Sequence, residues 1–277
     1  MHQEHFTPMA FDFLWESAEL GDLPYPLRVR SHGATELERR ALRQRVDNEL
    51  QARGIRDGRG RLERRIEDWL YLLARGSLTI DALHIPEFQA PTIAVLGATD
   101  GRDAVIAIQD QSGIWLREAP ADGLPTAVVD LLPPGQRGSE ASVTLPIDDA
   151  RRTEPIRAAI NPTKQAEEPE AAKSRRKDKP RVSLSERITA DPREAFGKLT
   201  GQPRLRGGQL AANSRSHVGA KQRSRVLGWF DTASGRYLST SQAGPDGREW
   251  VTVSPADVKT LRTRLGEMAA GVAVDTR

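Results

Sequence analysis

The strongest constraint on the fold is a change in the spacing of apolar residues near residue 78. Up to that point apolar side chains recur every three or four residues, as they do along one face of a helix. Beyond it they recur with a period near two, in short runs divided by turn-forming residues, which predicts strands. Four strands are predicted in succession: Leu78–Ile85, Thr92–Ala98, Asp103–Gln109 and Ile114–Glu118. Helices followed by consecutive short strands predict an α+β fold.

Three helices are predicted before this change, and their ends carry recognisable signals. They cover Thr7–Leu20, Thr35–Arg53 and the region of Arg61–Arg75. Thr35 and Glu38 form a capping box at the start of the second helix, and Gly54 ends it. Between the first two helices, Tyr25–Ser31 alternates apolar and polar residues, which predicts a half-buried strand.

The rest of the chain predicts a mixture of strands and helices. The predicted strands are Ala141–Pro146, Gln209–Ser216, Arg225–Phe230, Arg236–Ser241 and Glu249–Val253. The predicted helices are Leu124–Leu132, a weak helix that ends near Ile160, Asp191–Thr200 and a last helix near the C-terminus. In that last helix Ser254 is the expected N-cap and Pro255 the first residue. Its expected buried stripe is Val258, Leu261, Leu265 and Met268.

Residues 161–181 have the composition of a disordered, charged linker. They are rich in Pro, Lys, Glu, Ala and Arg and have no apolar face, so burial cannot offset the cost of ordering them. We expect this linker to join an N-terminal half, residues 1–160, to a C-terminal half, residues 182–277, within one domain. Most of the basic residues of this linker lie in Lys173–Arg181. The whole chain has a formal net charge of +3, so the part outside Lys173–Arg181 is close to neutral.

Two segments of the sequence resemble each other. Asp103–Leu116 and Ser224–Leu238 each show a strand, a turn with Asp and Ser-Gly, and a second strand with an aromatic residue beside Leu. This similarity suggests two related halves that contribute hairpins to one sheet. The alternative is that unrelated hairpins look alike, because Asp and Gly are ordinary turn residues.

The sequence offers little material for a metal site or an active site. The chain has no cysteine, which excludes disulfides, Cys-ligated zinc and thiol nucleophiles. Its five histidines lack the spacing of a metal motif. His2 and His5 lie in an N-terminus that we expect to fray. His32 and His84 lie near strand ends without an accompanying nucleophile, so neither predicts catalysis.

Three other patterns have structural explanations that we favour. The stretch PRLRGGQ, residues 203–209, is interpreted as a turn, although its glycines and arginines also allow a phosphate-binding nest. Asp110 and Asp231 lie in predicted hairpin turns, where aspartate accepts backbone hydrogen bonds. We therefore expect no catalytic residues.

The sequence favours an interaction protein over an enzyme or a membrane protein. No run approaches the roughly 18 apolar residues of a membrane span, and the N-terminus lacks a signal-peptide layout, so we expect a cytoplasmic protein. Aromatic residues gather in the C-terminal strands. Because successive strand residues point to opposite faces, Trp229 and Phe230 cannot both lie under one layer, which allows an aromatic protein-binding face. The alternative is that helices cover both faces.

Several segments, taken in order, carry a resemblance to a known family. They are residues 11–29 (FDFLWESAELGDLPYPLRV), 38–55, 69–83, 142–146, 196–215 and 234–257. This series resembles the EspG family, the ESX secretion-associated proteins of actinobacteria, from about Phe11 to Met268. No single motif is diagnostic; the ordered series carries the resemblance.

The resemblance implies a fold and a function. Members of the family have a central, mainly antiparallel sheet built from two quasi-symmetric halves, flanked by helices, with a C-terminal helical region. They are cytosolic chaperones of type VII (ESX) secretion that shield the apolar tip of a helical PE–PPE pair, without a cofactor or catalysis. The implied partner of this chain is a secreted helical protein of the PE/PPE or WxG type.

The resemblance also implies contact residues. Family members bind their cargo through a sheet hairpin loop and the C-terminal region. Carried over to this chain, the implied contact residues are Thr99, Asp100, Gly101, Arg102, Trp229, Trp250, Val258 and Leu261. The alternative function is a nucleic-acid-associated regulator that acts through Lys173–Arg181. Salt separates the two functions, because counterion release makes nucleic-acid binding strongly salt-dependent.

Overall fold

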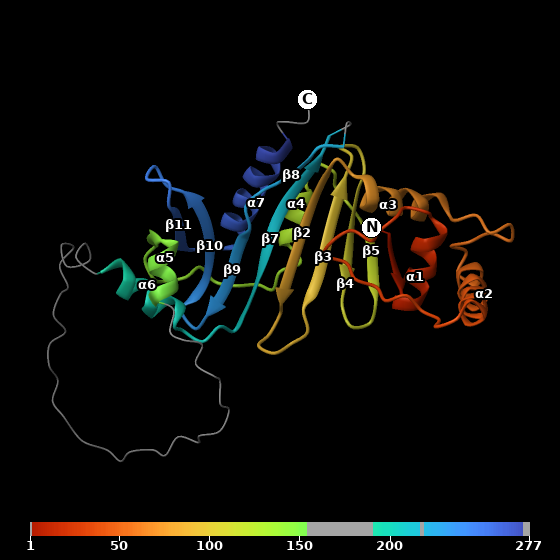
Figure 1. The fold of residues 1–277 in the computed structure, drawn as a ribbon, viewed down its shortest axis with the longest axis horizontal. Helices are drawn as coiled ribbons and strands as arrows, with labels where there is room; N and C mark the ends of the chain where they lie inside the picture. The colour runs from red at the N-terminus through yellow and green to blue at the C-terminus, as the bar shows by residue number, and fades with distance from the viewer. Residues whose placement is uncertain (1, 154–190, 217–218, 274–277) are drawn as a thin grey trace, which may run out of the picture.

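The chain builds one broad antiparallel sheet with helices on both faces (Figure 1). The structure is a computed structural model that describes residues 2–153, 191–216 and 219–273. The strands are β1 (Gln3–Phe6), β2 (Leu78–Ile85), β3 (Ile93–Thr99), β4 (Ala104–Gln109), β5 (Ile114–Ala119), β6 (Val143–Pro146), β7 (Arg206–Arg215), β8 (Lys221–Arg223), β9 (Leu227–Thr232), β10 (Gly235–Ala243) and β11 (Glu249–Pro255). The helices are α1 (Pro8–Ser17), α2 (Glu36–Ala52), α3 (Arg64–Arg75), α4 (Leu124–Val129), α5 (Ile147–Thr153), α6 (Pro192–Thr200) and α7 (Val258–Ala273).

The sheet consists of two halves with the same order of elements. Across the described residues the strands lie in the order β1-β5-β4-β3-β2-β7-β9-β10-β11-β6, with β8 paired beside β7. The first half runs α3, β2, β3, β4, β5, α4, and the second runs α6, β7, β9, β10, β11, α7. In each half an earlier strand extends the outer edge, β1 on β5 and β6 on β11. The expected α+β fold with two quasi-symmetric halves is therefore confirmed.

The two halves meet at a single long strand pair. β2 and β7 are antiparallel along eight residue pairs, from Leu78–Ser214 to Ile85–Gly207. In space the second half also includes β6 and α5, which precede residue 160, because β6 pairs with β11 and α5 packs on α6. The predicted linker, residues 161–181, lies entirely outside the described residues, and Lys173–Arg181 with it.

The two faces of the sheet are covered differently. On one face α4 and α7 pack over the middle of the sheet, where Leu210 and Trp229 join Leu261 in one buried cluster. On the other face α1 and α3 cover the first half, and α5 and α6 cover the second half (Figure 1). The helices on this second face therefore lie toward the two ends of the sheet.

This arrangement leaves a strip of the second face that no helix covers. Side chains alternate between the faces along a strand, so Thr79 and Leu83 of β2 and Gln209 and Asn213 of β7 point away from α7. These four side chains are only half-buried. We call this strip, between α3 and α6, the open face.

The predicted strand at Tyr25–Ser31 is wrong. This segment crosses the sheet instead of joining it, and a side chain of β4 satisfies its backbone. Arg28 N donates to Gln109 Oε1 at 2.8 Å, and Gln109 Nε2 donates to Arg28 O at 2.5 Å. Alternation alone cannot distinguish such a segment from a strand, because it records which side chains are buried and not what the backbone pairs with.

Two terminal predictions are also wrong. The N-terminus does not fray: β1 pairs with β5 and buries Phe6 completely. The last helix begins at Val258, because Ser254 is still paired with Leu238 in the sheet. Its first turn is capped by Asp257, whose Oδ1 accepts from Thr260 N at 2.7 Å.

A buried ion cluster holds one end of the second half together. Asp231, 4% exposed, accepts from Arg236 Nε at 2.7 Å and from Arg206 Nε at 2.6 Å. Arg236 is fully buried, and both guanidinium groups also donate to backbone oxygens, those of Pro133 and Pro134. The cluster therefore ties β7, β9 and β10 to the chain that leaves α4. The predicted turn position of Asp231 is wrong, because the residue belongs to β9 and pairs there with Arg206 of β7 and Arg236 of β10.

Replacing Asp231 with alanine should cost about 3–5 kcal/mol of unfolding free energy, because it leaves two arginines, one fully buried, without their carboxylate. Urea denaturation of the full chain, followed by circular dichroism, measures this loss. The matched control is Asp130→Ala, whose exposed carboxylate pairs with exposed Arg262. That change should cost at most about 1 kcal/mol. Equal losses in the two variants would contradict a stabilising role for the cluster.

Candidate functional site

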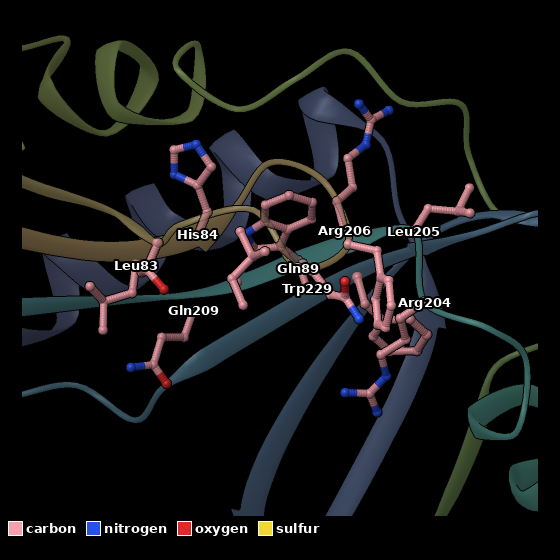
Figure 2. A pocket seen from close by; sticks show the side chains of 14 residues that line it. Leu83, His84, Gln89, Arg204, Leu205, Arg206, Gln209 and Trp229 are labelled. Atoms are coloured by element: carbon pink, nitrogen blue, oxygen red, sulfur yellow. The ribbon is translucent and has the colours of Figure 1, made fainter. Parts of the chain in front are cut away.

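A cavity of about 630 Å³ lies at the end of β2, beside β7 and β9 (Figure 2). We call it the hairpin pocket, because the connection between β2 and β3, residues 86–92, forms one of its walls. Most of its lining is apolar, which is typical of a surface that binds a protein or an organic group. The lining residues that matter below are Leu83, Ile85, Phe88, Arg204, Leu205 and Phe230.

Three large apolar side chains at this pocket are open to solvent. Phe88 is 54% exposed, Leu205 52% and Ile85 41%. Single exposed apolar residues are common, but a group of them around a cavity indicates an interaction site. Pro86 and Pro91 flank Phe88. Proline lacks the N–H that continues a ladder, so these residues favour a loop that carries Phe88 beyond the paired strands.

Two adjacent glycines let the strands come close together at the pocket. A Cβ on Gly208 would lie 2.4 Å from Leu83 O and 2.8 Å from Trp229 Nε1. A Cβ on Gly207 would lie 2.9 Å from Trp229 O. Both glycines belong to β7 and pair with β2 and β9. They therefore form neither the turn that the sequence favoured nor the phosphate nest that was its alternative.

Side chains at the pocket project to both sides of the strands. Figure 2 shows His84, Trp229 and Arg206 on one side and Leu83, Gln209 and Arg204 on the other. The first group lies toward the helices α4 and α7, and the second group lies on the open face. A partner at the open face therefore meets Leu83 and Arg204 directly.

The two arginines at the pocket differ in their partners. Arg206 is bound to Asp231 and to Pro134 O. Arg204 is exposed, and its guanidinium carbon lies 4.9 Å from the centre of the Phe230 ring. Arg204 is thus the positive group that the pocket presents to a partner.

His84 is buried without a hydrogen-bond partner at one ring nitrogen. It is 4% exposed, and no described residue bonds to Nδ1. Burial lowers the pKa of His84 below 6.5, because the charged ring loses its hydration. The ring therefore stays neutral at neutral pH and acts as a packing residue behind the pocket.

The residues implied by the family resemblance do not line the open side of this pocket. The turn Thr99, Asp100, Gly101 and Arg102 lies at the opposite end of β3, and Asp100 Oδ1 accepts from the backbone N–H of Arg102. It remains a separate predicted contact that the structure does not bring to the pocket. A partner in the hairpin pocket would instead contact the β2–β3 connection, residues 86–92, at the other end of β3.

The C-terminal residues of the predicted site are mostly enclosed. Leu261 is fully buried, and Trp229, although it lines the inner side of the pocket, is only 2% exposed. Val258 is half-buried at the start of α7. Trp250 is half-buried at the far end of β10 and β11, where Nε1 donates to Asp246 at 3.1 Å.

Sequence reasoning missed Phe88, Leu205 and Ile85. The available signal was an isolated phenylalanine between two prolines in the connection between two predicted strands. Asp110, by contrast, has the predicted turn role, since its Oδ1 accepts from the N–H of Ser112 at 2.8 Å. His32 bonds to Asp12 through Nδ1 and shows no catalytic arrangement.

Two further features concern metal ions and membranes. Among residues 2–153, 191–216 and 219–273, no three His, Asp or Glu side chains lie close enough together to hold a metal ion. Within the same residues, no helix has the length and the apolar content that a membrane crossing requires.

Gly208→Ala should destabilise the fold by about 1–3 kcal/mol, because the added methyl group meets the rigid Leu83 carbonyl. The control is Gly266→Ala in α7, where no atom lies within 4 Å of the new Cβ. Alanine there should leave the stability unchanged or raise it by up to about 1 kcal/mol. Urea unfolding of both variants checks the contrast, and a neutral Gly208→Ala would show that the strands can separate freely.

The buried His84 should make stability depend on pH. Above pH 6.5, the ordinary pKa of histidine, the neutral His84 makes its full contribution to the free energy of unfolding. As the pH falls below that value, the unfolded chain binds a proton that the folded chain resists, so the free energy of unfolding decreases. Urea denaturation at several pH values measures the free energy of unfolding as a function of pH. This free energy should fall less steeply toward low pH in His84→Leu than in the wild type. A pH-independent difference between the two proteins would disprove this role.

Comparison with known proteins identifies the family. The family model described as "EspG family" matches residues 7–267. A comparison with curated proteins finds no match. Among solved structures, the chain is similar to the Mycobacterium tuberculosis type VII secretion system chaperone EspG5, solved in complex with the PE25–PPE41 dimer. The TM-score is 0.66 at 13% identity, over 100% of this chain and 98% of that chain, which shows a shared fold. Since the family model spans almost the whole sequence, the chain belongs to the EspG family, as the resemblance predicted.

Proposed function

We propose that this protein is a type VII secretion chaperone whose hairpin pocket binds the apolar end of a secreted helical pair of the PE–PPE type. Membership of the EspG family supports the chaperone role. The observation that carries the proposal is the group of exposed apolar side chains, Phe88, Leu205 and Ile85, around a cavity on the open face. In the similar M. tuberculosis structure the chaperone is bound to a PE25–PPE41 dimer.

The mechanism is reversible burial of apolar surface. A secreted helical pair with an apolar tip would associate with other copies before export, because exposed apolar area drives aggregation. The hairpin pocket offers the tip a matching apolar lining. Binding covers the tip without a covalent step, so the role assigns no catalytic residue and no cofactor. The role places the protein in the cytoplasm, where its cargo is made.

The direct test is co-expression of the full chain with PE–PPE-type pairs encoded in its own genome. The expected result is a pair that stays soluble with the chain and elutes with it from size exclusion in fixed stoichiometry. The complex should survive nuclease treatment. It should also survive 300 mM NaCl, because apolar contacts depend weakly on salt. Failure of every such pair to bind, with nucleic acid retained at low salt, would favour the alternative regulator that acts through Lys173–Arg181.

The double variant Phe88→Ser/Leu205→Ser should weaken binding of the captured pair at least about thirtyfold, because truncation of central apolar anchors costs about 2 kcal/mol or more. Biolayer interferometry with the purified pair measures the dissociation constant. The matched control is Leu37→Ser/Tyr71→Ser on α2 and α3, which removes two large side chains elsewhere that are more exposed than Phe88 and Leu205. Both proteins should keep the wild-type melting temperature. Similar affinities for the two variants would remove the hairpin pocket from the binding site.

A further inference from the structure

We infer that the partner carries a carboxylate beside its apolar anchor, and that Arg204 is the residue that receives it. This inference rests on the proposed function and adds the chemistry of the partner surface. It assigns Arg204 a specificity role, separate from the apolar contacts of Phe88 and Leu205.

Arg204 is held in place but is electrostatically unpaired. Its guanidinium carbon lies 4.9 Å from the centre of the Phe230 ring, a stacking contact that leaves the N–H groups at the edge free to donate. Among the described residues, no carboxylate lies within ion-pair distance of Arg204. Its neighbour Arg206 is committed to Asp231 and Pro134 O. An exposed, stacked and unpaired arginine at a pocket rim is suited to an anionic group from outside.

The rest of the pocket has no negative charge that would oppose this pairing. Its lining contains two arginines and no Asp or Glu. Glu87, the acidic residue of the 86–92 connection, is exposed but is not part of the lining. Complementary charge across an interface selects partners and speeds their encounter, so the pocket favours an acidic apolar tip over a neutral or basic one.

A neighbouring hollow on the open face carries one arginine and one aspartate. It shares Leu83 and Thr92 with the hairpin pocket, and its lining includes exposed Arg28. The acid in its lining is Asp110, whose Oδ1 accepts from the N–H of Ser112 and of Gly113. Asp110 keeps its negative charge within its own turn, so this hollow offers a partner Arg28 but no net positive charge.

The same positive groups do not form a nucleic-acid track. Nucleic-acid binding uses several cations along a path together with aromatic platforms for bases. Here Arg204 and Arg28 lie in two adjoining hollows without an ion pair to any described residue, and the Phe230 ring beside Arg204 is already covered by its guanidinium. One carboxylate on an apolar protein tip fits this pattern.

The experiment uses the full chain and the PE–PPE-type pair obtained by co-expression, with dissociation constants measured at 50 and 300 mM NaCl. Arg204→Glu should weaken binding roughly tenfold at 50 mM, because it places like charges together, and the loss should shrink at 300 mM. Arg204→Lys should retain most of the affinity. The matched control is Arg45→Glu on the exposed surface of α2, which makes the same change in net charge and should stay within about twofold of the wild type.

A charge swap then locates the partner group. Each Asp or Glu at the tip of the pair is changed in turn to Lys. One of these changes should weaken binding to the wild-type chain and regain affinity with Arg204→Glu. Rescue of this kind requires a direct pairing, which a merely structural role for Arg204 would not produce. Melting temperatures confirm that each variant is folded.

The outcomes separate this inference from the function on which it rests. If the wild type binds the pair and Arg204→Glu behaves like Arg45→Glu, the carboxylate inference is overturned and the chaperone role stands. If the wild type binds no pair, both fail. If a random 20-base-pair DNA duplex binds with an affinity that depends on Arg204, the hairpin pocket binds nucleic acid and the inference is overturned.

Discussion

The pairing of β2 with β7 is the contact on which the rest of the structure depends. It joins two half-sheets of the same topology into one continuous antiparallel sheet. Gly207 and Gly208 let β7 approach both β2 and β9 where a Cβ would strike the backbone. Because the pairing is central, each half contributes one covering helix, α4 or α7, to a shared core on one face. The remaining helices are left toward the ends of the other face.

The open face is a direct consequence of that symmetry. α3 and α6 occupy equivalent places in the two halves, on the same face and well apart, so neither covers the junction. Polar and half-buried side chains such as Thr79 and Gln209 occupy the strip between them. The hairpin pocket lies at one end of this strip and adds exposed apolar side chains. In the proposed function, the strip between α3 and α6 is the surface that the chaperone offers to its cargo.

Local sequence patterns located most elements because their signals are local. The capping box at Thr35 and Glu38 marks the start of α2, where Glu38 N donates to Thr35 Oγ1, and Leu78–Ile85 matches β2 at both ends. The failures required knowledge of distant partners. Gln109 holds the backbone of the segment around Arg28, and β5 captures the N-terminus as β1. The predicted contact residues Trp229 and Leu261 were recognised as apolar, but apolar residues are buried or exposed according to what packs on them.

Most element types and the family follow from the sequence alone, which also suggested the two related halves, because periodicity, end signals and the order of segments are written along the chain. Which side chains are exposed and available to a partner follows only from the tertiary structure. Phe88 and Phe230 are both aromatic, yet Phe88 projects from the β2–β3 connection while Phe230 is enclosed between Tyr237 and α6. Arg204 and Arg206 stand two residues apart, yet Asp231 neutralises only Arg206. Burial and pairing depend on residues far away in the chain, so no local pattern could have separated these cases.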